Sequence, residues 1–211
     1  MVERTVGGRT TARYLARHME LARFLWWMAT AALVLPFLDL VQRTFGPQEW
    51  VERATAQRVF LGGLEAATLV AWLLVRGRWQ FLPEHDAGVA IAGAVLALTG
   101  ALFAAWGKAR LGHLFSPQLG VQEGHRLVTS GPYAVVRHPI YLGLIDFTIG
   151  SALYWNDVAL LGVALLFVIW FTAQIRIEER LFSMHFGSEW EDYRARTPAL
   201  FPRVLPRRPK P

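Results

Sequence analysis

Residues 87–106 read AGVAIAGAVLALTGALFAAW, an apolar stretch of twenty residues without a charged side chain. A helix rises about 1.5 Å per residue, so this stretch spans roughly 30 Å, the thickness of a bilayer's hydrocarbon core. In the whole chain 54% of residues are hydrophobic and only 18% are charged. Because helices satisfy their backbone hydrogen bonds internally, these features predict an all-α integral membrane protein.

Further apolar segments lie on both sides of this stretch. They cover about residues 21–41, 59–75 (with Glu65 at its centre), 139–155 and 158–175. Only Asn156-Asp157 separates the last two, and so short a turn predicts an antiparallel helical hairpin. The charged residues 176–197 that follow predict an amphipathic cytosolic segment, and the basic residues 1–20 predict a short interfacial helix. We therefore expect about five transmembrane helices, with the helical hairpin near the C-terminus.

Composition divides the chain into two parts. Residues 1–106 hold three predicted crossings, whereas 107–211 mix Gly, Pro, His and Arg with shorter apolar runs. The 107–138 linker and the tail beyond residue 175 hold twelve Lys and Arg, which predicts that both face the cytosol. Three crossings then place the N-terminus outside despite its five arginines. Either one early segment does not fully span, or the C-terminal charge decides the orientation.

Charge and composition exclude several classes of function. The net charge is +6, but the basic residues lie between and beyond the apolar segments, a pattern that favours contact with membrane lipids over nucleic acid. Without cysteine the chain has no disulfide, thiolate nucleophile or Cys-ligated zinc. The six histidines show no ligand-like spacing, so we expect no metal site.

The polar residues that suggest chemistry lie at the two ends of the predicted hairpin. Arg137-His138 precedes the fourth segment and Glu178-Glu179 follows the fifth, so the hairpin brings them to one surface. Charged groups at this depth are expensive and often functional. Such a cluster suits a ligand with a carboxylate, an ammonium group and a stackable ring, such as S-adenosylmethionine. A purely structural salt bridge between Arg137 and a glutamate is the alternative.

Four sequence blocks carry a family resemblance. They are HRLVTSGPY at 125–133, RHPIYLG at 137–143, Glu178-Glu179, and Phe186-Gly187 with Tyr193. In order and spacing they resemble the isoprenylcysteine carboxyl methyltransferase family, whose wider relatives include phospholipid N-methyltransferases. The resemblance covers about residues 107–205, and it implies a membrane methyltransferase that binds S-adenosylmethionine in a cytosol-facing pocket.

The resemblance also implies roles for individual residues. By matched position, the cofactor site includes Gln118, His125, Leu127, Val128, Tyr133, His138, Pro139, Ile140, Tyr141 and Glu178. Glu178 is expected to hold the cofactor's ammonium group. Arg137, His138 and Glu179 are the candidate catalytic residues, and either His138 or Glu179 could act as a base toward a thiol or an amine.

The acceptor of the methyl group is less defined. Family members that methylate a prenylated cysteine carboxylate carry an Arg one turn before the glutamate, where this chain has Gln174. Arg176 lies about 200° further around the helix and is expected to face elsewhere. Gln174 and Asp146, which we expect to face the bundle interior, are the candidate substrate contacts. A lipophilic or small acceptor that reacts through carboxylate oxygen, thiol sulfur or amine nitrogen fits these residues.

A non-enzymatic small transporter or scaffold is the competing class of function. Many transporters consist of two similar halves with Gly- or Pro-broken helices near the bilayer midplane. This chain shows no internal repeat, and its functional candidates gather in the C-terminal half. The sequence therefore favours the enzyme.

Overall fold

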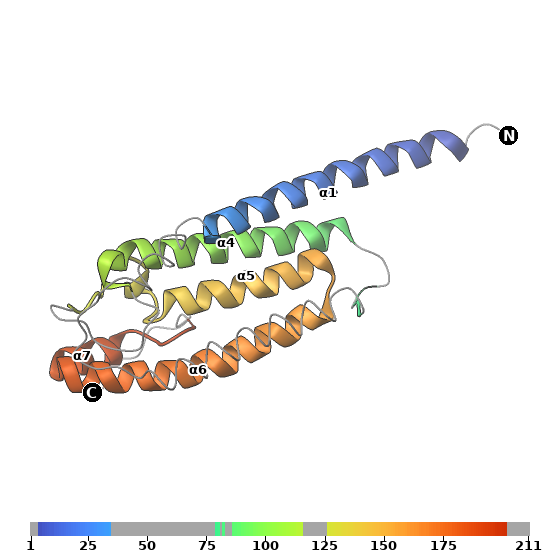
Figure 1. Ribbon diagram of the computed structural model, residues 1–211. Helices are drawn as coiled ribbons and strands as arrows, with labels where there is room; N and C mark the ends of the chain where they lie inside the picture. Colours follow the sequence, from blue (N-terminus) through green and yellow to red (C-terminus); the bar gives the residue numbers. More distant parts are fainter. Residues whose placement is uncertain (1–3, 35–78, 81, 83–85, 116–125, 202–211) are drawn as a thin grey trace, which may run out of the picture.

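The computed structural model describes residues 4–34, 79–80, 82, 86–115 and 126–201, and in this part of the chain all regular structure is helical (Figure 1). The α-helices are α1 (Arg4–Val34), α4 (Ala87–Leu111), α5 (Pro139–Trp155), α6 (Val158–Phe186) and α7 (Ser188–Arg196), with short 3-10 turns η2 (Gly112–Leu114) and η3 (Gly131–Ala134). α4 packs between α1 and α5, and α6 packs on α5. The predicted all-α class is confirmed for the described residues.

The N-terminal helix differs from the expected short interfacial helix followed by a separate crossing. α1 runs without a break from Arg4 to Val34. No proline interrupts residues 4–34, so the backbone hydrogen bonds continue through the predicted boundary at residue 20. Near its middle, Trp26 stacks on Tyr154 at 5.5 Å and donates its indole N–H to the Ser151 hydroxyl at 3.1 Å. The segment expected at 59–75, with Glu65, lies outside the described residues.

Small residues bring α4 and α5 into close contact. Gly93, Gly100 and Gly107 repeat every seven residues on α4, and Gly143 and Gly150 do so on α5. A Cβ atom on Gly100 would lie 2.7 Å from the Gly143 carbonyl oxygen, and one on Gly93 would lie 2.6 Å from that of Gly150. The helix backbones therefore touch, as in other small-residue interfaces of membrane proteins.

Part of this interface follows the alanines that are spaced four residues apart at positions 97, 101 and 105. Ala97 and Ala101 are fully buried, while Ala105 is only half-buried because the contact line follows Ala104 and Gly107 instead. The heptad glycines were not anticipated.

α5 and α6 are connected through Asn156, which adopts a left-handed conformation with φ of 52°. Asp157 caps α6 by accepting a hydrogen bond from the Ala159 N–H at 2.8 Å. The Asn156 side chain exchanges two hydrogen bonds with the Leu82 backbone, at 2.9 and 3.0 Å. This connection turns the chain back, so that α6 runs alongside α5 (Figure 1).

Two of the described helices, α4 and α6, are long and apolar enough to cross a membrane. α5 has 17 residues, near the lower limit of about 17 for a crossing. These two helices agree with a membrane protein, and five crossings stay a prediction.

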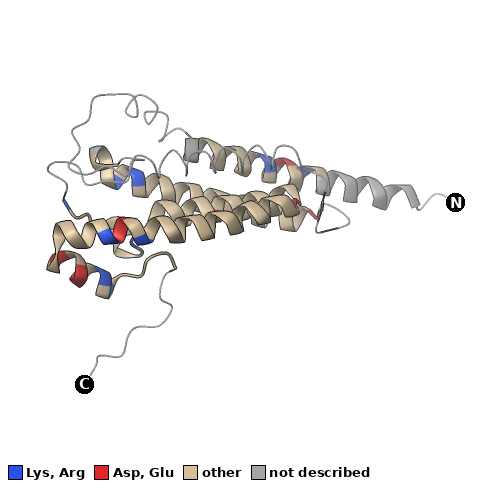
Figure 2. Cartoon of the chain, turned by 60° about the horizontal axis from the view of Figure 1, so that its bottom comes forward, with Lys and Arg blue, Asp and Glu red and all other residues tan. Residues whose placement is uncertain are grey.

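α6 continues well beyond the predicted end of its apolar segment at residue 175. It ends only at Phe186, where Gly187 adopts a φ of 53° and starts α7. Consequently Glu178 and Glu179 lie on the same rigid helix as the apolar residues before them. The charged residues of α6 and α7 lie at one end of the bundle (Figure 2).

The glycine interface yields a stability prediction. Gly100→Ala places a methyl group against the backbone of α5, so the helices must separate, at a cost of about 1–3 kcal/mol. At roughly 2–4 °C per kcal/mol, the melting temperature in detergent should fall by several degrees.

Gly162→Ala is the matched control, because a Cβ at this exposed α6 glycine meets no atom within 4 Å. Equal melting temperatures for the Gly100 and Gly162 variants would refute close packing of α4 on α5.

Candidate active site

A cavity opens where the start of α5, the last third of α6, α7 and η3 meet. Its volume is about 920 Å³, counting the space open to solvent. Of the residues predicted for the site, those that line the cavity are Leu127, Val128, Tyr133, Arg137, His138, Pro139, Ile140, Tyr141 and Glu178. Predicted site residues that are far apart in the sequence therefore line one cavity.

The start of α5 is fixed from outside the helix. Pro139 begins α5, and the backbone N–H groups of Arg137 and His138 donate to the carbonyl oxygens of Pro198 and Ala199, at 2.8 and 3.0 Å. The chain after α7 thus holds the Arg137-His138 dipeptide in place.

Arg137 forms the most connected ion pair of the site. Its guanidinium donates to Glu179 Oε1 at 2.5 and 2.9 Å, and it also donates to the backbone carbonyls of Arg194 (3.1 Å) and Thr197. The side chains of Arg137 and Glu179 are only 8% and 11% exposed. The salt bridge considered from the sequence is present, and its Arg137 lines the cavity.

His138 lies between the two glutamates. Its Nδ1 is 3.4 Å from Glu178 Oε2 and its Nε2 is 3.3 Å from Glu179 Oε1. Burial, the largest effect, lowers the pKa of His138, but hydrogen bonds and charge from the two glutamates together raise it above its ordinary value. Since carboxylates only accept hydrogen bonds, this arrangement favours an imidazolium that donates from both nitrogens.

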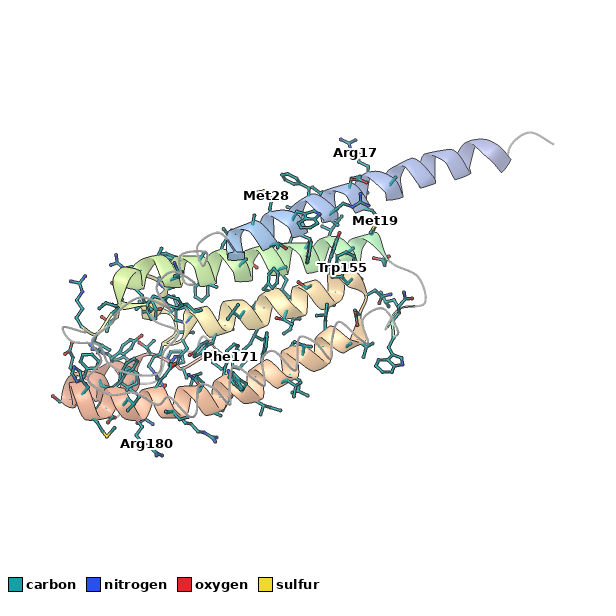
Figure 3. The ribbon with its side chains drawn as sticks, viewed as in Figure 1. Arg17, Met19, Met28, Trp155, Phe171 and Arg180 are labelled. Carbon is teal, nitrogen blue, oxygen red and sulfur yellow. The ribbon has the colours of Figure 1, made fainter. Side chains whose placement is uncertain are left out.

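Glu178 lines the cavity, and its carboxylate is held there by contacts with neighbouring side chains. Tyr141 donates its hydroxyl to Glu178 Oε1 at 2.5 Å, and the Gln174 amide nitrogen lies 3.4 Å from the same oxygen. Tyr141 also stacks between His138 and Phe171, with ring centroids at 5.6 and 4.4 Å. Figure 3 labels Phe171 on α6, which contributes this outer ring of the stack.

α7 supplies the aromatic part of the wall. Trp190 is 1% exposed, and its ring lies 5.7 Å from the Arg137 guanidinium carbon. Tyr193 donates to the Tyr133 carbonyl at 2.7 Å, and the Tyr133 hydroxyl donates to the Gly107 carbonyl at 3.4 Å. Burial raises the pKa of both tyrosines far above the ordinary value, so both stay neutral donors.

Other predicted residues lie elsewhere. Gln118 and His125 lie outside the described residues. Asp146 does not line the cavity, because it sits two turns along α5 where it packs against Gly100 of α4. Gln174 is buried behind Tyr141 and Glu178. Within the described ranges, no group of three His, Asp or Glu residues could hold a metal ion.

The sequence did not single out every lining residue. The wall also includes Leu111, Leu114, Phe115, Leu181 and Phe182, together with the α7 aromatics. Tyr193 belongs to the sequence blocks that carry the family resemblance, and Trp190 lies beside it among charged residues. The leucines carry no signal of their own, since they differ in no way from lipid-facing residues.

Comparison with known proteins gives a family for this region. Residues 89–189 match the family model described as phospholipid methyltransferase. This range contains most of the cavity wall, from α4 to the start of α7. Residues 89–189 are therefore similar to the phospholipid methyltransferase family.

Individual relatives agree with the methyltransferase assignment. The chain is 37% identical over 83 residues to protein-S-isoprenylcysteine O-methyltransferase of Schizosaccharomyces pombe (39% of this chain, 35% of the relative). It is 38% identical over 80 residues to methanethiol S-methyltransferase 2 of Bradyrhizobium diazoefficiens (36% and 29%). It is also 38% identical over 84 residues to the nickel-cobalt-cadmium resistance protein NccN of Alcaligenes xylosoxydans xylosoxydans (39% of each).

These matches cover well under half the length of each relative. The resemblance to the isoprenylcysteine carboxyl methyltransferases and their phospholipid-methylating relatives is confirmed for this part of the chain.

The buried ion pair yields a second stability prediction. Glu179→Gln leaves the Arg137 guanidinium buried without its counter-charge, which should destabilise the fold by about 3–5 kcal/mol. Thermal unfolding in detergent measures the loss. Glu191→Gln is the control, because Glu191 pairs with Arg194 at 3.6 Å on the half-exposed surface of α7 and should contribute less than about 1 kcal/mol. Similar losses for both variants would contradict the central role of the pair.

The protonated His138 yields a pH prediction. Its folded-state pKa is raised, so its stabilising contribution is complete below the unfolded-state pKa of about 6.5 and disappears as pH rises through the folded-state value. The melting-temperature difference between wild type and His138→Asn should therefore shrink as the pH increases.

His185→Asn, at an exposed position near the end of α6, controls for the loss of a histidine in general. A difference between wild type and His138→Asn that stays constant with pH would exclude the imidazolium.

Proposed function

We propose that this chain is an integral membrane methyltransferase that uses S-adenosylmethionine and transfers its methyl group to a lipophilic or small acceptor. Glu178 carries this proposal, because it exposes a carboxylate to the cavity within the region that matches the phospholipid methyltransferase model. The methyl donor has two positive groups, an ammonium and a sulfonium, and both favour a negatively charged site.

The cavity suits the donor in chemistry as well as charge. Its apolar and aromatic wall, which includes Leu127, Val128 and Phe182, can enclose a flat adenine ring. Glu178 would hold the ammonium group, as the family resemblance implies.

S-adenosylmethionine, when bound, supplies a methyl group that is already activated on sulfur. The protein's contribution is then alignment and exclusion of water, worth up to about 7–11 kcal/mol in well-positioned systems. Arg137 and Glu179 act as positioning residues, since they neutralise each other and fix the start of α5. His138 orients Glu178 through its Nδ1.

A base for proton removal is less evident in this geometry. A histidine that donates from both nitrogens has no free acceptor, and Glu179 is engaged by Arg137, His138 and Arg194. We infer that the acceptor's proton leaves to solvent through the open side of the cavity.

The acceptor reaches this site from the bilayer side in our proposal. Arg176 and Arg180 are exposed on α6, one turn apart and next to its apolar stretch, where they suit the phosphate layer of a membrane. Figure 3 labels Arg180 on this outer side of α6. The cavity would then lie at headgroup depth, facing the cytosol, with residues 107–211 as the catalytic core of a multi-pass protein.

The competing transporter or scaffold function has less support. Those classes do not require a pocket in which a carboxylate and aromatic rings converge. The family of residues 89–189 is named for methyl transfer.

Cofactor binding tests the proposal directly. Purified wild-type protein in detergent should bind S-adenosylmethionine and its demethylated product in calorimetry, and Glu178→Gln should weaken both by at least about tenfold, or 1.4 kcal/mol. Glu191→Gln, an exposed glutamate away from the cavity, should leave the affinity unchanged. No binding by folded wild type would refute the proposed function, and equal binding by Glu178→Gln would refute the role of Glu178.

A further inference from the structure

The outer side of α6 changes from apolar to basic along its length. Leu165 and Ile169 are 61% and 60% exposed on a helix that is long and apolar enough to cross a membrane. Arg176 and Arg180 are exposed further along the same helix, and Figure 3 labels Arg180 on this outer side. At about 100° per residue, Ile169, Arg176 and Arg180 fall within about 40° of one another around the helix axis. One strip of α6 therefore carries an apolar surface followed by two guanidinium groups.

Among the residues that the structure describes, neither arginine of this strip has a counter-charge. The acidic residues of α6 are Glu178 and Glu179, and both are engaged on the inner side of the helix. Glu178 accepts the Tyr141 hydroxyl, and Glu179 pairs with Arg137. The two outer guanidinium groups are therefore available to an anion from outside the chain.

The length of α6 places these two arginines at the level of lipid phosphates. At the start of the helix, Val158 donates its N–H to the Trp79 carbonyl at 3.1 Å, and Trp79 and Trp155 are both exposed there. Exposed tryptophans are typical of the membrane–water interface, so this end lies at one surface of the bilayer. Arg176 and Arg180 follow about 27 and 33 Å further along the helix. These distances bracket the hydrocarbon thickness of about 30 Å.

A phosphate ester suits two arginines that are one helical turn apart. Side chains at this spacing are neighbours on the helix surface, so both guanidinium groups can reach one phosphate, to which arginine donates parallel hydrogen bonds. A phosphocholine headgroup offsets its phosphate with its own ammonium charge, whereas a phosphatidylglycerol headgroup stays negative. The unpaired positive charge therefore favours the anionic lipid.

We propose that Arg176 and Arg180 form a binding site for the phosphate of an anionic phospholipid, whose acyl chains lie along Leu165 and Ile169. This inference goes beyond the proposed function, because lipid binding here needs no methyl transfer. The site occupies the outer side of the helical turns whose inner side carries Glu178, so the bound lipid belongs to the leaflet on the side of the cavity.

Fluorescence quenching at one labelled position tests the site. The chain has no cysteine, so Ala173→Cys provides a single attachment point for a fluorophore, and Ala173 is exposed just before Arg176. The labelled protein in phosphatidylcholine vesicles would be titrated with phosphatidylglycerol or phosphatidylcholine that carries the same spin-labelled acyl chain. Phosphatidylglycerol should reach half-maximal quenching at a mole fraction about five- to thirtyfold lower, the effect of one to two basic residues near an anionic lipid.

Variants of the labelled protein assign the preference to the two arginines. Arg176→Gln/Arg180→Gln should reduce it to less than twofold, whereas Arg176→Lys/Arg180→Lys keeps both charges and should keep the preference. Arg196→Gln is the control for removal of a surface charge, because Arg196 is exposed on α7 and donates to the Asp192 carbonyl. This control should leave the preference unchanged.

Three results would overturn the inference. Equal quenching of the labelled wild type by the two lipids would do so without any variant. A preference that survives in Arg176→Gln/Arg180→Gln would place the lipid elsewhere. An equal loss in Arg196→Gln would show attraction to the overall charge of the protein and exclude a defined site.

Discussion

The buried pair of Arg137 and Glu179 is the interaction on which the rest of the site depends. One guanidinium connects the start of α5, the C-terminal third of α6 and the chain that leaves α7. Removing water from two charges is costly, and here two hydrogen bonds to Glu179 and two backbone acceptors offset that cost. Glu179 neutralises Arg137. The carboxylate of the adjacent residue, Glu178, therefore stays available to a ligand in the cavity. Adjacent glutamates thus have separate tasks, one structural and one directed at a ligand.

The glycine interface between α4 and α5 provides the second constraint. Close approach of the helix backbones brings the end of α4 beside the start of α5, where the Gly107 carbonyl accepts the Tyr133 hydroxyl. Leu111 and Leu114, which follow along α4 and η2, then close the cavity from that side. Larger residues at the glycine positions would move this wall away. The packing of apolar helices therefore sets the shape of a polar site at their end.

Much of the site was predictable from the sequence because its blocks have strong local signals. Proline is favoured at the first position of a helix, which agrees with Pro139 at the start of α5. The short Asn156-Asp157 connection lets Arg137-His138 and Glu178-Glu179 lie at the same end of α5 and α6. The division of labour between Glu178 and Glu179 was not predictable. Both residues are one turn beyond the apolar stretch, and only the position of Arg137 in three dimensions distinguishes them.

Helix ends were predicted less well, for a physical reason. A change from apolar to charged residues marks where a helix leaves the membrane and says nothing about where its backbone hydrogen bonds stop. α1 and α6 both continue through such a change, and α6 ends only at Gly187, where the left-handed backbone favours glycine. The glycines spaced seven residues apart on α4 and α5 were overlooked, because each helix contains many other small residues that obscure this spacing.

Binding of the methyl donor in the cavity beside Glu178 is the step on which the proposed function depends. A structure of the protein with S-adenosylhomocysteine tests it most directly. We predict that the product's amino group lies within hydrogen-bonding distance of the Glu178 carboxylate, while Glu179 stays paired with Arg137. Product bound elsewhere, or a cavity in which its amino group avoids Glu178, would contradict the account.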